Sequence, residues 1–190
     1  MIQKSRIRTS WKNKEKKISV SEFANALSAI CWRMSLNAAK NLHQQDFEYQ
    51  TDSQRLGVIQ QYLFFFIHCA DRLVFDHFDQ ENRAEFINAL SVDCQNHFAI
   101  NALEIMNQEI DPSDFVTSLN QAMEGLSRCR FIAREPGYEM YRVLGSGVQE
   151  ILGQSQTNKW VIDQVMDIDG PEAFEFFRKS FDKLKKSSDF

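Results

Sequence analysis

The fold is decided by residues 61–78, QYLFFFIHCADRLVFDHF, which contain the longest run of apolar side chains in the chain, Tyr62 to Ile67. On a helical wheel of about 100° per residue, this stretch and the residues before it have one broad apolar face opposite a polar face. Leu56, Ile59, Leu63, Ile67, Ala70 and Val74 lie on the apolar face. The spacing therefore predicts a long, largely buried helix over residues 54–77. Phe65 falls on the polar side, which suggests contact with a partner or with the C-terminal helices.

Helix start signals occur on both sides of this stretch. Ser19 and Glu22 have the spacing of a capping box, in which each side chain bonds the backbone of the other residue. Asp79 is a second candidate cap, and Asp111 before Pro112 is a third, because proline suits the first helical position. With only 7 Gly and 3 Pro in the chain, long uninterrupted elements are expected.

These signals predict an all-α fold, a helical bundle of four long helices plus three shorter C-terminal helices. The long helices are expected at about 21–43, 54–77, 79–108 and 112–133, and the shorter ones at about 138–152, 157–168 and from 171 onward. A turn is expected at REPGY, and the run Asp169-Gly170-Pro171 is expected to separate the last two helices.

The charge is unevenly distributed along the 190 residues. Residues 1–17 carry seven basic side chains against Glu15 alone, whereas the whole chain has a net charge of −4. We therefore expect a basic, flexible N-terminal arm over 1–17 and a single all-α domain over 18–190. An acidic body argues against a dedicated nucleic-acid-binding domain, so nucleic acid could bind only through the arm.

The remaining composition bears on location. Six consecutive apolar residues are too few to span a bilayer, which needs about 20, so no membrane span is expected. The four cysteines form no CxxC pair, and no apolar segment typical of a secretory signal follows the basic residues. We expect reduced thiols and a cytoplasmic location.

Polar residues within apolar faces are the candidate site. Asp71 falls between an aromatic pair and the apolar face of its helix, and a buried carboxylate is costly unless it is paired or ligated. His68, one turn earlier, is a possible partner. In the next helix, Asp93, His97 and Glu104 continue an apolar stripe as a polar row, so the helix either changes its buried face or directs this row inward.

Three interpretations of these residues remain open. His68, Asp71, Asp93, His97 and Glu104 could bind a divalent metal between the second and third helices, since bundles build metal sites from facing helices. They could instead form a structural polar network, or the row at His97 could simply be exposed. The Glu-x-x-His and HExxH motifs of bundle metalloenzymes are missing from the sequence, which favours the structural network.

No recognisable catalytic motif is found, which favours a protein that is not an enzyme and requires no cofactor. The 16 phenylalanines and the position of Phe65 favour a protein that acts through homo-oligomer formation or a protein partner. The alternative is a metal- or small-ligand-binding bundle that uses the five residues named above.

Overall fold

The structure is a computed structural model that describes residues 18–107, 109–155 and 157–188; the predicted basic arm over 1–17 lies outside them. Helices dominate this part of the chain, with one two-stranded hairpin, so the predicted all-α class is confirmed. The elements are α1 (Val20–Gln44), α2 (Asp52–Val74), α3 (Gln80–Met106), α4 (Pro112–Ser127), β1 (Phe131–Ile132), β2 (Glu135–Pro136), α5 (Tyr138–Leu152), α6 (Val161–Gln164), η2 (Val165–Asp169) and α7 (Gly170–Lys185). The predicted capping box at Ser19 and Glu22 is present, and Asp79 and Asp111 cap α3 and α4.

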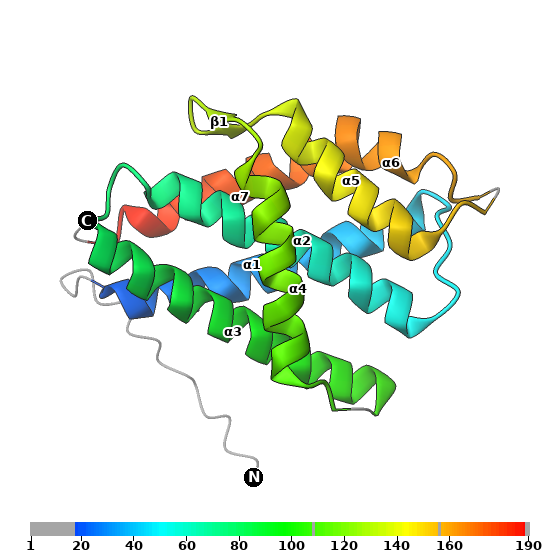
Figure 1. Cartoon of the computed structure of the whole chain (residues 1–190), viewed down its shortest axis with the longest axis horizontal. Coiled ribbons are helices and arrows are strands. Elements are labelled where there is room, and N and C mark those ends of the chain that lie inside the picture. Colours follow the sequence, from blue (N-terminus) through cyan, green and yellow to red (C-terminus); the bar gives the residue numbers. More distant parts are fainter. Residues whose placement is uncertain (1–17, 108, 156, 189–190) are drawn as a thin grey trace, which may run out of the picture.

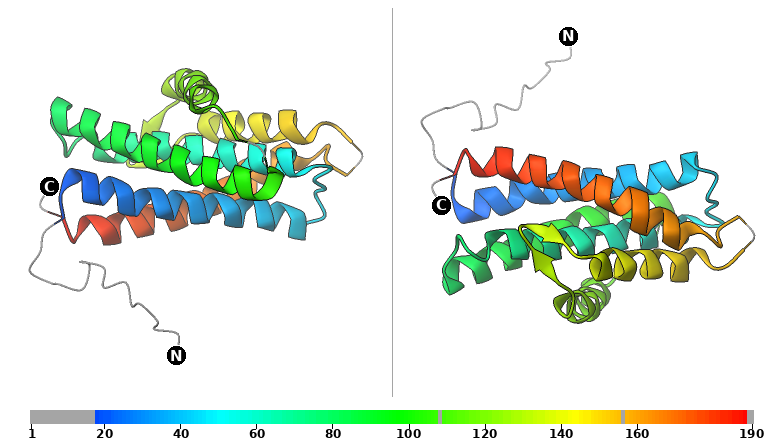
Figure 2. Two further views of the ribbon diagram at one scale, coloured as in Figure 1. Left: turned by 90° about the horizontal axis from the view of Figure 1, so that it is seen from below. Right: turned by 90° about the horizontal axis from the view of Figure 1, so that it is seen from above.

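The helices form two layers with α4 outside them. Figure 2 shows α1 and α7 side by side in one layer and α2, α3 and α5 in the other. Helix α4 crosses the outer side of the second layer at a steep angle to α2 (Figure 1). Helix α2 is therefore covered from several directions, and every residue from Tyr62 to Ala70 is buried.

The three consecutive phenylalanines of α2 each contact a different helix. The ring of Phe64 lies 5.2 Å from that of Phe115 in α4, and the ring of Phe66 lies 4.9 Å from that of Phe177 in α7. Phe65, which the sequence places on the polar side, packs against Tyr141 of α5 with 5.8 Å between ring centroids. A C-terminal helix of the same chain thus covers Phe65.

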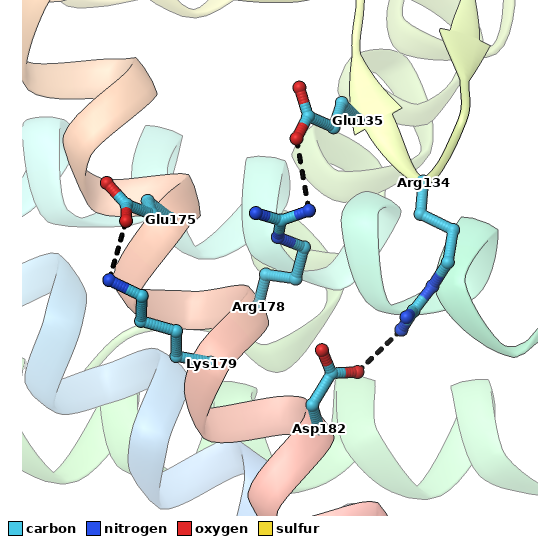
Figure 3. Close-up of polar contacts among 6 residues, drawn as sticks. All are labelled: Arg134, Glu135, Glu175, Arg178, Lys179 and Asp182. Carbon is cyan, nitrogen blue, oxygen red and sulfur yellow. Dashed lines mark hydrogen bonds and ion pairs between the residues drawn. The ribbon is translucent and has the colours of Figure 1, made fainter.

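The segment after α4 differs from the prediction. Helix α4 ends at Ser127, earlier than expected, and the predicted turn is a short antiparallel hairpin. Ala133 and Arg134 form its tip with φ angles of 54° and 64°. Arg134 pairs with Asp182 at 2.6 Å and Glu135 with Arg178 at 3.0 Å, so two ion pairs connect the hairpin to α7 (Figure 3).

A second difference concerns the start of α7. The predicted break at Asp169-Gly170-Pro171 is instead a π-helical turn, η2, inside a continuous helical segment. The N–H of Gly170 donates to the carbonyl of Val165, five residues earlier. Pro171 has no N–H and its ring crowds the preceding turn, so a wider turn lets the chain pass this proline without ending the helix.

Two further expectations can be compared with the structure. Cys31, Cys69 and Cys94 are buried and Cys129 is half-buried, all as free thiols. Among the residues that the structure describes, no helix has both the length and the hydrophobicity required to cross a membrane.

Candidate functional site

Asp71, the misfit carboxylate of α2, is paired with an arginine of α3. Arg83 donates from Nε to Oδ1 and from Nη2 to Oδ2 of Asp71, both at 2.6 Å. The guanidinium also lies over the ring of Phe75, 4.7 Å from its centroid. Two parallel charge-assisted hydrogen bonds are the strongest way to satisfy a carboxylate. Arg83, and not His68, is therefore the partner of Asp71.

His68 is buried beside this pair. Burial lowers the pKa of His68, while the negative charge of Asp71 acts in the opposite direction. Arg72 and Arg83 add to the lowering of this pKa, because two nearby cations disfavour an imidazolium. The surroundings therefore favour a neutral imidazole.

The polar row of α3 faces α1 in its first half and solvent at its end. Asp93 accepts a hydrogen bond from Nδ2 of Asn25 in α1 at 3.1 Å. The ring of His97 stacks on that of Trp32, also in α1, with 6.3 Å between centroids and 16° between planes. Glu104, two turns beyond His97, is exposed. Asp93 and His97 therefore contact α1, whereas Glu104 faces solvent.

The five predicted metal ligands are consequently not gathered at one point: His68 lies beside Asp71, whereas the three residues of α3 have other neighbours. Asp71 bonds to Arg83, Asp93 to Asn25, and His97 stacks on Trp32. Within residues 18–107, 109–155 and 157–188, no three His, Cys, Asp or Glu side chains are grouped so that they could hold a metal ion. These contacts match the structural network, the second of the three interpretations, at Asp71 and Asp93.

A carboxylate that the sequence reading did not select lies at the π-helical turn. Asp169 is only 5% exposed, and its Oδ1 accepts long hydrogen bonds of 3.4 Å from the side chains of Gln45 and Gln164. Its Oδ2 has no hydrogen-bond partner in the described part of the chain. Burial raises the pKa of Asp169, and the two amide hydrogen bonds only partly oppose that effect. The sequence signal for this residue is an Asp before Gly-Pro inside a helical apolar pattern.

Tyr62 of α2 is a second buried polar group without a partner. Its hydroxyl makes no hydrogen bond with any residue that the structure describes, and its side chain is completely buried. Burial raises the pKa of Tyr62, and the negative charge of Asp169 raises it further. The two groups therefore interact electrostatically in the interior. Unsatisfied buried groups are rare in proteins and call for a physical explanation.

One cavity lies where α1 ends and α2 begins. Its volume is about 720 Å³, and Leu36, Ile59 and Ile105 contribute apolar lining. Lys40, His43, Tyr49, Asp52 and Arg55 contribute polar lining. Because Arg55 is paired with Asp52 at 3.0 Å, part of its charge is already compensated.

A smaller groove between α3 and α4 has a different character. It has a volume of about 340 Å³ and no charged side chain in its lining. The lining residues are Ile67, Ile87, Asn88, Ser91, Val92, Gln95, Phe115, Val116, Leu119, Asn120 and Met123. Val92 is 54% exposed and Val116 is 45% exposed, so each presents an apolar side chain to solvent at the groove.

The face that contains this groove extends along α3. Leu103 lies eleven residues after Val92, about 20° from it on the helical wheel, and is exposed too. Helix α4, whose only buried residues are Phe115, Leu119 and Leu126, projects from the outer side of the second layer (Figure 2), and residues 115, 116, 119, 120 and 123 of it line the groove. We call the groove lining together with Leu103 the α3–α4 face.

Comparison with known proteins gives no match for this chain among family models, curated proteins or solved structures.

Proposed function

We propose that this chain acts through protein–protein contact, by forming a homo-oligomer through the α3–α4 face. The observation that carries the proposal is the groove whose lining holds no charged side chain, in a chain of which 25% is charged. Depletion of charge at the centre of a surface patch is the compositional signature of protein interfaces.

The net negative charge of the body favours a second copy of this chain as the molecule that binds the α3–α4 face. Residues 18–190 carry a net charge of about −10, because the seven basic residues before Ile18 offset only part of the acidic total. Two acidic bodies repel each other wherever their contact brings like charges together. A face without charge avoids that repulsion, and it can be removed from water without leaving a buried ion unpaired.

The shape of the α3–α4 face also favours binding of a second copy of this chain. A two-fold dimer uses one surface patch twice, so the patch must contain both a ridge and a groove. The α3–α4 face contains the projecting helix α4 with Val116 and, next to it, the groove that includes Val92. The ridge of one copy would fit the groove of the other.

Analytical ultracentrifugation of the full chain tests this proposal. We expect a dimer at a protein concentration of about 0.1 mM, far above the Kd of a contact in the micromolar range. Val116→Arg should give a monomer, because it places a charge in the dry centre of the contact. Ile168→Arg is the matched control, since Ile168 is also β-branched and also 45% exposed, and it lies in the segment leading into α7.

A monomeric parent protein would overturn the proposal. It would also be overturned by a dimer that persists in both Val116→Arg and Val92→Arg, since the contact would then lie elsewhere. Circular dichroism of each variant verifies that the loss of association is not a loss of fold.

A further inference from the structure

The cavity between the end of α1 and the start of α2 differs in charge from the body that contains it. Its lining includes two basic side chains, Lys40 and Arg55, against one carboxylate, Asp52, so its net charge is +1 while His43 is neutral. Residues 18–190 as a whole carry a net charge of about −10. The lining is therefore locally positive in an acidic body, and a cleft of this kind attracts ligands of the opposite sign.

Lys40 is the basic side chain of this lining whose charge is not compensated. No carboxylate of the described chain forms an ion pair with it, whereas Arg55 is held by Asp52 at 3.0 Å. An ammonium group has three N–H donors and no acceptor, so Lys40 can donate to an anion without breaking an existing ion pair. The side-chain amides of Asn37 and Gln50 are neutral donors in the same lining.

An apolar surface from three helices lies in the same cavity as these donors. The apolar lining residues are Leu36 and Ala39 of α1, Ile59 of α2 and Ile105 of α3. Ile59 is buried and Ile105 is half-buried, so a ligand that covers them would remove little polar surface from water. Binding sites for small molecules combine such an apolar lining with a few polar groups that fix the orientation of the ligand.

Tyr49 contributes its ring to the cavity and not its hydroxyl proton. The hydroxyl donates to the carbonyl of Ala39 at 2.9 Å, and the ring lies 6.3 Å from the ring of His43. The hydrogen bond fixes Tyr49 against α1, so the cavity has a preformed aromatic side. Donors for an anionic group must therefore come from Lys40 and its neighbours.

The size and charge of the cavity select the class of ligand. Its volume of about 720 Å³ is suited to an organic molecule, because sites for such ligands measure roughly 300–1,000 Å³. A phosphate monoester carries a charge of about −1.5 to −2 at neutral pH, which exceeds the charge of the lining. A single carboxylate carries one negative charge and balances it.

We propose that this cavity binds a small monocarboxylate with an apolar carbon chain. Its carboxylate accepts hydrogen bonds from Lys40, and its chain lies against Leu36, Ile59 and Ile105. None of the lining residues belongs to the α3–α4 face, so the inference does not depend on self-association.

Isothermal titration of the full chain at neutral pH tests the proposal with octanoate, hexanoate, acetate and octanamide. We expect one octanoate per chain with a Kd in the millimolar range or tighter. Each methylene removed from the chain should weaken binding about 4-fold, because its burial is lost, and acetate should not bind detectably. Octanamide has the same length without the charge and should bind about 5-fold more weakly than octanoate or worse.

Two lining variants should change the affinity for octanoate in opposite directions. Lys40→Met should weaken binding about 5-fold, because it removes the free cation. Asp52→Asn should tighten binding, because it frees Arg55 from its carboxylate and raises the net charge of the lining. Lys183→Met is the matched control for Lys40→Met, since Lys183 is also exposed and lies on α7 outside the lining, and its affinity should equal that of the parent.

The absence of saturable octanoate binding would overturn the proposal. So would octanamide binding as tightly as octanoate, several octanoates binding per chain, or equal losses in Lys40→Met and Lys183→Met. Circular dichroism verifies the fold of each variant. Val116→Arg should bind octanoate as the parent does, so failure of the dimer and failure of the carboxylate site are separate results.

Discussion

Asp71 and Asp169 are two inward-facing carboxylates that differ in how well their hydrogen-bonding capacity is satisfied. Asp71, between α2 and α3, receives two hydrogen bonds of 2.6 Å from one guanidinium. Asp169, between α1 and α7, receives two of 3.4 Å from amide groups, all on one oxygen. The first carboxylate is satisfied by the fold and stabilises a helix contact. The second has no donor on Oδ2 among the described residues, which costs stability.

The largest effect is expected from Gly170→Ala, which disturbs the Asp169 side of this comparison. A Cβ at Gly170 would lie 2.7 Å from the backbone oxygen of Val165 and 2.9 Å from the Tyr141 ring. A backbone oxygen cannot move without opening the π-helical turn, so we expect a loss of about 3 kcal/mol in the free energy of unfolding. Urea denaturation measures it.

Gly125→Ala is the control for this substitution. Its Cβ would lie 4.0 Å from a methyl of Val143, the nearest atom outside its own stretch of helix, so the space is open. Alanine favours helix over glycine by up to about 1 kcal/mol, so this variant should be as stable as the parent or more so. Equal losses in the two variants would show that the turn at Gly170 is not specially constrained.

Arg83→Met is expected to have the next largest effect. It keeps most of the side-chain length but leaves Asp71 without its partner, for a loss of about 2 kcal/mol in this partly exposed pair. Arg72→Met is the matched control, because Arg72 also lies over the Phe75 ring, at 5.1 Å, and should lose less than about 1 kcal/mol. Unfolding in urea at pH 7 compares them, and indistinguishable variants would contradict a structural role for the Asp71–Arg83 pair.

Asp169→Asn should change stability in the other direction. The raised pKa of Asp169 means that the folded protein binds its proton more readily than the unfolded chain does. Stability from this group is therefore greatest below the ordinary Asp pKa of about 3.9 and falls as pH rises through the raised value. Removing the charge should stabilise the protein by about 1 kcal/mol at pH 7.

The pH dependence of unfolding shows whether the stability gained in Asp169→Asn comes from removing the charge. The difference between the variant and the parent should shrink as pH approaches 4, because the parent carboxyl is then protonated as well. Thermal unfolding across this range measures it. A gain that is constant with pH would attribute the effect to packing and not to charge.

The smallest effect is expected from His68→Leu. Because the pKa of His68 is lowered, the unfolded chain binds this proton more readily, and stability falls as pH drops below about 6.5. The variant should lack this contribution, which we expect to be about 0.5 kcal/mol between pH 7.5 and 5.5. Urea unfolding at the two pH values checks it, and identical slopes for parent and variant would contradict a buried neutral imidazole.

The local signals in the sequence were sufficient for most of the fold. Ser19 with Glu22, Asp79, and Asp111 before Pro112 all mark true helix starts, since caps depend on neighbouring residues alone. Phe65 was ambiguous because a helical wheel does not tell which helix will cover a given face.

The contacts of the candidate site residues were harder to predict from the sequence than the helices. Asp71 was recognised as requiring a partner, but the choice of Arg83 depends on how α2 and α3 approach each other. From sequence, the run Asp169-Gly170-Pro171 is expected to separate the last two helices, because proline after glycine normally ends a helix. In the structure, the Gly170 N–H donates to the carbonyl of Val165, the helical segment is continuous, and Asp169 is buried within it.

The two ends of the described chain lie together, and this has a mechanical consequence. Ile18 forms a bridge with Ser188, directly beside the start of α1 and the end of α7. Tension applied at these two points would pull the start of α1 away from the end of α7, so the contacts between the two helices would break one turn after another. The helices would not slide past each other. Contacts that break in sequence resist much less than contacts that break together, so this molecule should yield at low force when it is pulled from its ends.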